Sequence, residues 1–202
     1  MDLKLYKSNQ NEDYKSYIIP GSLPKPPFRM VMVGPSQSGK SMLLKNIIFN
    51  DEFGYRDYFD NIICWIGSID DYIEMKHMVS SHGLQKKVLL FNEYNDEFTK
   101  KIYNEIELEH NKKDTKTLLC FDDMICDGVS KTSQKTMLDK IFVQRRHIGA
   151  SCIISTQKFR FLNQNMRSLN CSHLIVFSST STEDLLQISK EHAGHLTRSE
   201  EH

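Results

Sequence analysis

The sequence lacks long hydrophobic runs, an excess of charge of either sign and cysteine motifs. No apolar stretch in its 202 residues approaches the roughly 18 residues of a membrane-spanning helix, so no membrane span is predicted. The first residues, MDLKLYKSNQNEDYKSY, are polar and of mixed charge, and they contain no apolar segment of the kind found in a secretory signal. We therefore expect a protein that is not secreted.

Cysteines are few, and their spacing indicates no metal or redox motif. The number is odd, no two are spaced as C-x-x-C, and three lie in apolar runs that read as strands. We expect reduced, mostly buried thiols in an intracellular compartment. The five cysteines are Cys64, Cys120, Cys126, Cys152 and Cys171.

Charge is balanced overall but not along the chain. With 26 basic and 26 acidic residues, the net charge gives no general indication of nucleic-acid binding. Residues 131–170, however, carry eight basic residues and one acid, a net charge of +7. Such a block is typical of a solvated helix face, and it also suits contact with phosphate or DNA.

The order of patterns along the chain predicts a short extension followed by one α/β domain. Residues 1–28 end in the proline-rich IIPGSLPKPPF, which favours a stiff, extended connector. From 29 to 202, short apolar runs alternate with longer helical patterns, which predicts parallel strands buried on both faces and joined by crossover helices. We expect a three-layer α/β sandwich with a mostly parallel central sheet. Strands are expected at 28–33, 61–67, 87–92, 117–122, 151–156 and 173–178, and helices at 41–49, 95–113, 133–148 and 181–192, among others.

The stretch FRMVMVGPSQSGKSMLLKNI, residues 28–47, contains the phosphate-loop spacing G-x-x-x-x-G-K-S. Gly34 and Gly39 let the backbone turn so that its N–H groups approach phosphates, and the following helix N-terminus favours an anion. Lys40 would reach the β- and γ-phosphates, and the Ser41 hydroxyl would bind Mg²⁺. The flanking strand and helix patterns support a site for a nucleoside triphosphate. Its predicted residues are Gly34, Pro35, Ser36, Gln37, Ser38, Gly39, Lys40 and Ser41.

A second motif, TLLCFDDM, supplies the acids that such a loop requires on a neighbouring strand. Asp122 is expected to help hold Mg²⁺, and Asp123 has the position of the carboxylate that orients the attacking water. An aspartate there is one methylene shorter than the commoner glutamate. By itself the octet would also fit a strand that ends in a solvated acidic turn.

Two further segments carry candidate catalytic residues. SCIISTQ ends at Gln157, which at the tip of a strand beside the phosphate loop could contact the γ-phosphate or the lytic water. Arg145 and Arg146 end a helix, where the helix dipole alone stabilises cations, and they are also suited to reach a neighbouring subunit's γ-phosphate. The pattern does not choose between these two arginines. His147 is expected to be a packing or capping residue.

One apparent motif is rejected. NKKD, Asn111–Asp114, matches the guanine-reading N-K-x-D of GTPases, but it precedes the acidic strand instead of following it. The single D-x-x-G, Asp51–Gly54, comes directly after the first helix, without the strand on which GTPases place this motif. A solvated turn at a polar helix end is the expected structure of NKKD, and guanine specificity is not predicted.

Together, GPSQSGKS, LLCFDD, RRHIGASCIISTQ and NQNMRSLNCSHLIVF resemble the genome-packaging ATPases of large DNA viruses and virophages, the poxvirus-type packaging ATPases of the FtsK/HerA superfamily. The resemblance covers 28 to about 190, and its most specific part is the arrangement of Arg146, His147, Ser151 and Gln157. It implies a RecA/ASCE-like P-loop NTPase domain. Family members often continue with further strands and a helix, so the resemblance implies either a C-terminally truncated chain or a compact member.

The resemblance implies an Mg-dependent ATPase that forms a ring of identical subunits and moves double-stranded DNA into a preformed capsid. Capsid or packaging-vertex proteins are implied partners, and the host cytoplasm, viral factory or virion is the implied location. DNA contact would come from the block 131–170 or from Lys112, Lys113 and Lys116. Two alternatives stay open at this point: a P-loop nucleoside or nucleotide kinase, and a nucleotide-gated assembly scaffold that does not hydrolyse ATP.

Overall fold

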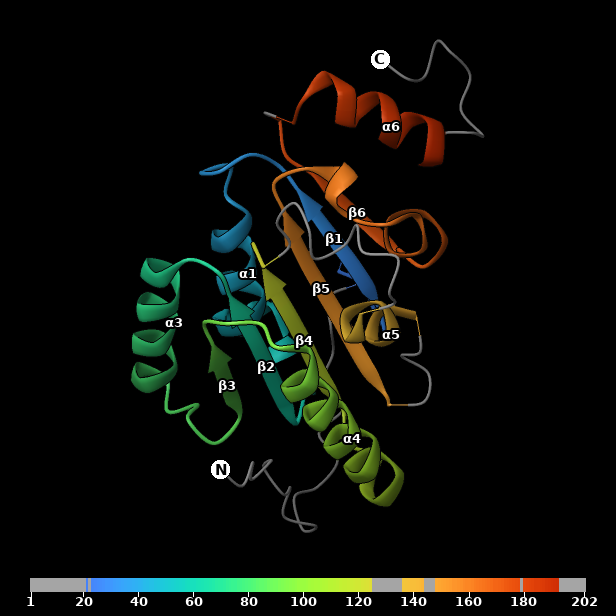
Figure 1. Ribbon diagram of the computed structural model, residues 1–202. Helices are drawn as coiled ribbons and strands as arrows, with labels where there is room; N and C mark the ends of the chain where they lie inside the picture. Colours follow the sequence, from blue (N-terminus) through green and yellow to red (C-terminus); the bar gives the residue numbers. More distant parts are fainter. Residues whose placement is uncertain (1–20, 22, 125–135, 144–147, 179, 193–202) are drawn as a thin grey trace.

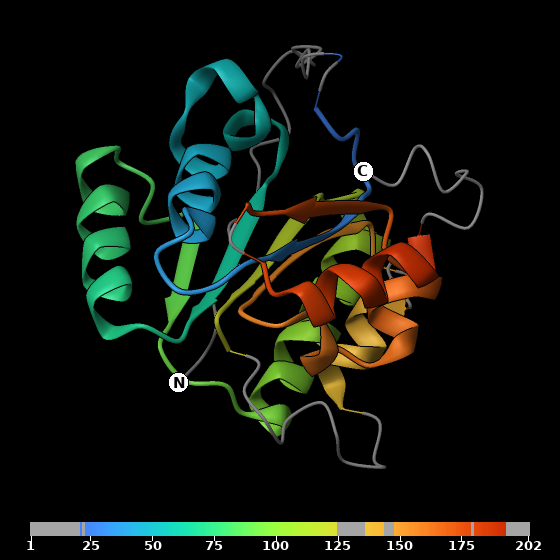
Figure 2. The same ribbon diagram turned by 90° about the horizontal axis from the view of Figure 1, so that it is seen from above.

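The computed structural model describes residues 21, 23–124, 136–143, 148–178 and 180–192. Within these residues, six strands form one sheet in the order β3-β2-β4-β5-β1-β6, and every neighbouring pair is parallel. Helices cover both faces of the sheet, with α1 and α3 on one side and α4 and α5 on the other (Figures 1 and 2). The expected three-layer α/β sandwich is therefore confirmed.

The strands lie where the apolar runs placed them. They are β1 (Arg29–Val33), β2 (Asn61–Ile66), β3 (Val88–Phe91), β4 (Thr117–Asp122), β5 (Ala150–Thr156) and β6 (His173–Val176). Strands β2, β4 and β5 are buried at every residue, as expected for parallel strands covered on both faces. The expectation of burial on both faces is wrong for β3 and β6, because these two strands form the edges of the sheet and are partly exposed.

Helices α1 to α5 lie in the connections between strands, and α6 follows β6, the last described strand. Those named from the sequence are α1 (Lys40–Phe49), α4 (Asp96–Lys113), α5 (Met137–Val143) and α6 (Thr182–His192). Two more, α2 (Tyr55–Tyr58) and α3 (Ile69–Ser81), were not among them. Short helical turns η1 (Asp51–Phe53), η3 (Phe159–Phe161) and η4 (Asn165–Leu169) complete the described elements, the last of them a π-helical turn.

Two hydrophobic clusters, one on each face of the sheet, hold the layers together. Alternate residues of β2 and β4 point to opposite sides, so Trp65 and Phe121 pack toward α4 and α5, while Cys64 and Cys120 pack toward α1 and α3. The rings of Trp65 and Phe121 stack with centroids 4.6 Å apart. Full burial of such large side chains contributes about 1.5–3 kcal/mol each, so these clusters stabilise the packing of the helices on the sheet.

Four cysteines fall within the described residues, and all four are free thiols: Cys64, Cys120 and Cys152 are buried and Cys171 is partly buried. This agrees with the expectation of reduced thiols, and Cys126 lies outside the described residues. None of the described helices combines the length and the apolar character needed to cross a bilayer. Just before β1, the Tyr55 hydroxyl donates a hydrogen bond to the carbonyl of Pro24 at 2.6 Å, which attaches the proline-rich segment to the domain.

Candidate nucleotide-binding site

The loop between β1 and α1 has the backbone geometry of a phosphate loop. Gln37 and Gly39 have positive φ values, 63° and 102°, which turn successive N–H groups toward one side. A Cβ on Gly34 would lie 2.7 Å from both the Phe177 Cβ and the Ser38 Oγ, so this position has room for glycine alone. The loop ends in α1 without a side-chain cap, which leaves the first N–H groups of the helix for a ligand anion.

Lys40 lies folded over this loop with its side chain 3% exposed. Its Nζ donates hydrogen bonds to the carbonyls of Gly34 and Pro35, both at 2.9 Å. The same Nζ lies 3.8 Å from Asp123 Oδ1. The phosphate-loop lysine and the second aspartate, separated by more than eighty residues in the sequence, therefore face each other across the end of the sheet.

Strand β5 lies between the phosphate-loop strand β1 and the acidic strand β4. The expectation that the acids lie on the strand next to β1 is therefore wrong by one strand, because order along the chain does not fix order across the sheet. Strand β5 is hydrogen-bonded to both halves of the site: Gly34 N–H donates to Thr156 O at 3.2 Å, and Asp123 N–H donates to Ser155 O at 3.3 Å. The expectation that Gln157 follows the strand beside the phosphate loop is confirmed.

Asp122 is the last residue of β4 and is 3% exposed. Its Oδ1 is buried and, within the described part of the structure, accepts no hydrogen bond. A buried carboxylate oxygen without a partner is costly unless a cation or water occupies the space beside it. Hard oxygen ligands suit Mg²⁺, so the carboxylate of Asp122 and the hydroxyl of Ser41, at the start of α1, are the types of donor that fit this ion.

Asp123 follows in the left-handed conformation, with φ of 49°, which turns its side chain back toward β1 and β5. Burial raises the pKa of its carboxyl above the ordinary value; the Lys40 charge opposes that rise, and the neighbouring Asp122 adds to it. Gln157 Nε2 donates to Asp123 Oδ2 at 3.5 Å, a long contact. A carboxylate with a raised pKa, held between an ammonium and an amide, has the surroundings of a general base.

The basic block 131–170 is partly neutralised by α6. Arg160 pairs with Glu183 and Asp184, and Arg167 pairs with Glu191. These two arginines are thus paired with acids of the same subunit. Arg145, Arg146 and His147 lie outside the described residues.

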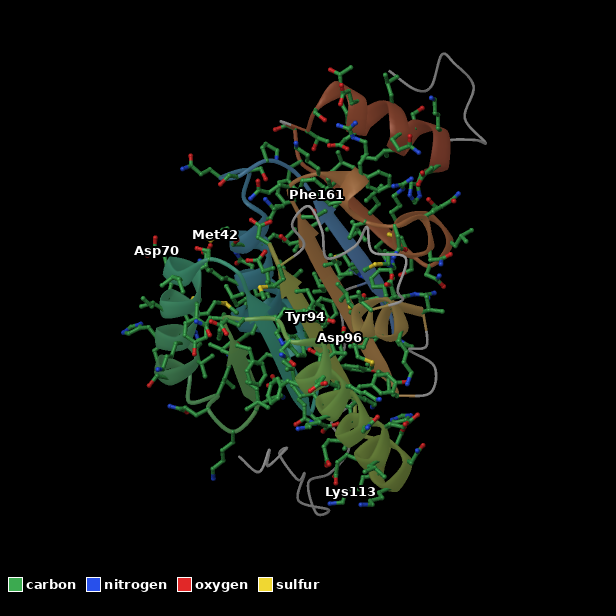
Figure 3. The ribbon with its side chains drawn as sticks, viewed as in Figure 1. Met42, Asp70, Tyr94, Asp96, Lys113 and Phe161 are labelled. Atoms are coloured by element: carbon green, nitrogen blue, oxygen red, sulfur yellow. The ribbon has the colours of Figure 1, made fainter. Side chains whose placement is uncertain are left out.

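The rejected guanine motif is a helix end, as expected. Asn111, Lys112 and Lys113 form the exposed last turn of α4, and Asp114 caps it in the left-handed conformation. Figure 3 shows Lys113 at the lower end of α4, far from Met42, which lies in α1 shortly after the phosphate loop.

The contact between α1 and α3 was not found from the sequence. Buried Lys45 of α1 donates to Asp71 Oδ1 at 2.7 Å and to Glu74 Oε2 at 2.6 Å, both on α3. Asp71 also adds to the raised pKa of Asp123, which places its charge within electrostatic reach of the site. In the sequence, the pattern Ser68-x-x-Asp71 shortly after β2 could have indicated the start of helix α3. In the structure, the Ser68 hydroxyl accepts the Asp71 N–H.

Fold and site together define a P-loop NTPase in which one strand separates the phosphate-loop strand from the acidic strand. The chain belongs to the family described as "Poxvirus A32 protein", whose sequence model matches residues 16–198. Membership in this family confirms the resemblance to poxvirus-type packaging ATPases. No match is found among curated protein sequences.

Solved structures with the same fold include two viral proteins. The genome packaging NTPase B204 of Sulfolobus turreted icosahedral virus 2, in complex with AMP, has a TM-score of 0.64 at 22% identity, over 85% of each chain. B204 of Sulfolobus turreted icosahedral virus, described as a DNA-packaging ATPase, has a TM-score of 0.64 at 23% identity, over 84% of each chain. The type VII secretion ATPase EccC of Thermomonospora curvata has a TM-score of 0.52 at 17% identity, over 77% of this chain and 20% of its own.

Proposed function

We propose that this protein is an ATP-hydrolysing motor that moves viral double-stranded DNA into capsids. The observation that carries the proposal is the convergence of Lys40, Asp123 and Gln157 at the carboxyl ends of β1, β4 and β5. Membership in the poxvirus A32 protein family supports the assignment of this site to a packaging ATPase. Fold relatives are described as genome packaging NTPases, and one of them was solved with ATP-γ-S.

In the proposed mechanism the phosphate loop binds ATP through backbone N–H groups and Lys40. On binding, Lys40 exchanges the carbonyls of Gly34 and Pro35 for phosphate oxygens, a stronger, charge-assisted contact. Ser41 and Asp122 would hold Mg²⁺, and a bound Mg²⁺ would supply positive charge beside the phosphates. These roles need no rearrangement of β4, since Asp122 already lies buried at its end.

Asp123 is proposed as the base that accepts a proton from the attacking water. Its raised pKa makes it a better proton acceptor than an ordinary aspartate. Gln157, hydrogen-bonded to the same carboxylate, would orient this water or sense the γ-phosphate. Arg145 or Arg146 would stabilise the transition state on the neighbouring subunit's ATP, a contribution of about 10³–10⁵ in rate where GTPases use it.

This assignment requires a ring of identical subunits, double-stranded DNA as the substrate and a capsid or packaging-vertex partner. The host cytoplasm, viral factory or virion is the proposed location. Because Arg160 and Arg167 are paired within the subunit, DNA contact is assigned to the other basic residues of the block 131–170 and to Lys112, Lys113 and Lys116. Backbone contact of this kind weakens steeply as salt rises and does not depend on sequence.

The test is steady-state ATP hydrolysis by the purified protein, with and without linear double-stranded DNA, across a range of protein concentrations. A rate per subunit that rises with concentration and with DNA supports a motor whose site is completed between subunits. Hydrolysis that ignores DNA, with phosphate transfer to added nucleosides, would identify a kinase instead. Tight ATP binding without turnover under any condition would identify a nucleotide-gated scaffold.

The arginines are tested by mixing subunits. Arg145→Ala and Arg146→Ala are each expected to be inactive alone if that arginine is required. Mixed with Lys40→Ala, which keeps both arginines but cannot bind ATP tightly, the essential variant should regain activity. No recovery at any ratio would contradict action across a subunit interface.

A further inference from the structure

Ser155, next to last in strand β5, carries a hydroxyl that is buried in the sheet. The residue is 0% exposed, and within the described part of the chain its Oγ has no hydrogen-bond partner. A hydroxyl that loses its hydrogen bonds to water on burial and gains none in return destabilises the fold. Such groups are rare in native structures, and a bound ion or water is one of the usual reasons for them.

Ser155 points to the same face of the sheet as Asp122. The two residues are register partners on the parallel strands β5 and β4, and partners in register point to one face. The residues two positions before them, Ile153 and Cys120, pack in the cluster beneath α1 and α3. Figure 1 shows α1 beginning at the carboxyl end of the sheet. Both side chains therefore project toward the layer whose first turn carries Ser41.

Two buried oxygens without partners thus lie on neighbouring strands. Asp122 Oδ1, like Ser155 Oγ, takes part in no hydrogen bond within the described residues. Neighbouring strands lie about 4.8 Å apart, which is close to the span of two hydrogen bonds to one water molecule. One oxygen carries negative charge and the other is a neutral acceptor, so the pair suits a cation together with a water bound to it.

Burial without a partner does not by itself mark a ligand site, as Thr117 shows. Its hydroxyl is also buried, at 0% exposure of the residue, and has no partner among the described residues. Thr117 lies at the start of β4, at the opposite end of the strand from Asp122. Its register partners are Asn61 and Ala150. Ser155 differs because its register partner is a carboxylate with an oxygen that is itself unpartnered.

The main chain of Ser155 is already joined to the proposed base. Its carbonyl oxygen accepts the Asp123 N–H at 3.3 Å. Asp123 Oδ1 in turn lies 3.8 Å from the Nζ of Lys40. Ser155 therefore stands between the buried acid at the end of β4 and the aspartate that follows it, with its side chain in register with the first and its backbone bonded to the second.

We propose that Ser155 is a positioning residue for the metal: its hydroxyl accepts a hydrogen bond from a water of the Mg²⁺ that Asp122 and Ser41 would bind. Mg²⁺ in proteins keeps several of its waters, and the groups that hold outer parts of a metal site orient the ligands that touch the ion. The inference rests on the proposed function, because it requires a nucleotide and Mg²⁺ at the phosphate loop.

The test measures metal affinity directly, with Mn²⁺ in place of Mg²⁺ so that electron paramagnetic resonance reports free Mn²⁺. A non-hydrolysable ATP analogue is held on an excess of the full-length protein, and the analogue alone gives the baseline. Ser155→Ala should bind Mn²⁺ about tenfold to 100-fold more weakly than the wild type, the usual cost of losing an outer partner of a metal site. Analogue affinity in EDTA should stay within about twofold, because the phosphate loop is unchanged.

Two further variants frame the result. Thr117→Val removes a buried, unpartnered hydroxyl at the far end of β4 and should keep the wild-type Mn²⁺ affinity. Asp122→Asn removes the charge of the proposed ligand itself and should lose more Mn²⁺ affinity than Ser155→Ala. Without nucleotide, the melting temperature of Ser155→Ala should be unchanged or higher, since the substitution removes a buried polar group that has no partner.

Three results would overturn the inference and leave the proposed function intact. The first is wild-type Mn²⁺ affinity in Ser155→Ala while Asp122→Asn loses it. The second is an equal loss in Ser155→Ala and Thr117→Val, which would show a general loosening of the sheet. The third is a lower melting temperature of Ser155→Ala without nucleotide, which would show a structural hydroxyl. A wild-type protein that binds neither the analogue nor Mn²⁺ would instead refute the proposed function.

Discussion

Arg167 and Glu191 form a two-pronged ion pair between the turn η4 and helix α6. The Arg167 Nε lies 2.9 and 3.0 Å from the two carboxylate oxygens of Glu191, and Nη2 lies 2.7 Å from Oε1. Ser168 and Gln187 also donate to this carboxylate. Because the pair is largely shielded from water, it joins α6 to the body of the domain more strongly than a surface ion pair would.

We predict that this cluster makes stability depend on acidic pH. Burial alone would raise the pKa of Glu191, but the hydrogen bonds from Arg167, Ser168 and Gln187 outweigh it and hold the pKa at about 2, below the ordinary 4.5. A depressed carboxyl pKa stabilises the folded state fully above pH 4.5, and that contribution is lost as pH falls from 4.5 toward 2. The contribution is at most about 3 kcal/mol at neutral pH.

Glu191→Gln should therefore unfold at lower denaturant concentration at pH 7, and the difference from wild type should shrink toward pH 2. Equilibrium unfolding across this pH range measures both effects. Glu183→Gln is the matched control, because Glu183 pairs with Arg160 on the surface and its loss should cost less than about 1 kcal/mol. Equal losses for the two variants would contradict the special role of Glu191.

Lys40→Ala should lose tight ATP binding. Removing a charge-assisted contact to phosphate costs about 1.5–3 kcal/mol, which corresponds to roughly tenfold to 150-fold in affinity. Calorimetric titration with a non-hydrolysable ATP analogue measures the change, with Lys76→Ala on the exposed face of α3 as the control. Unchanged affinity in Lys40→Ala would show that the lysine stays on its loop carbonyls when nucleotide binds.

Asp123→Asn should bind ATP and hydrolyse it about 10²–10⁴ times more slowly, the usual contribution of a general base. In the wild type, the rate should fall as pH drops through the raised pKa of Asp123, at higher pH than for an ordinary aspartate. Because the folded state favours the neutral carboxyl, the substitution should also raise thermal stability at pH 7. Normal turnover by Asp123→Asn would remove this residue from the role of base.

Gly34→Ala tests the close packing of the phosphate loop. The added methyl group would lie 2.7 Å from the Phe177 Cβ, an atom fixed near the backbone, so the loop must shift. We expect a loss of about 1–3 kcal/mol in stability, typical of overpacking, together with weaker ATP binding. Thermal melting and analogue titration provide the readouts, and Gly21→Ala, with open space around its Cβ, should change neither.

The sequence predicted the central strands well because their signal is local. A strand such as TLLCFD is apolar throughout since it is covered on both faces, and β4 has the same bounds as that motif. The edge strands were predicted with the right positions and the wrong burial. Edge status depends on the order of strands across the sheet, and the amino-acid pattern of VLLF or HLIV does not encode it.

The candidate site was predictable where a motif fixes both residue type and conformation. Gly34, Lys40 and Asp122 belong to such motifs. The contact of Lys45 with Asp71 and Glu74 could not be found in this way, because these partners lie more than twenty residues further along the chain, on another helix. Helix α3 was missed because its exposed face carries Ile69 and Ile73, which blur the amphipathic pattern that the other helices show.

Strand β5, the single strand between the phosphate loop and the acidic strand, can couple these two halves of the site. The end of β5 accepts a hydrogen bond from Gly34 at Thr156 and from Asp123 at Ser155, and its next residue is Gln157. A small slide of β5 along its axis would therefore change the geometry of ATP binding and of water activation at the same time. A change at the carboxyl end of β5 would therefore reach both halves of the site through a single strand.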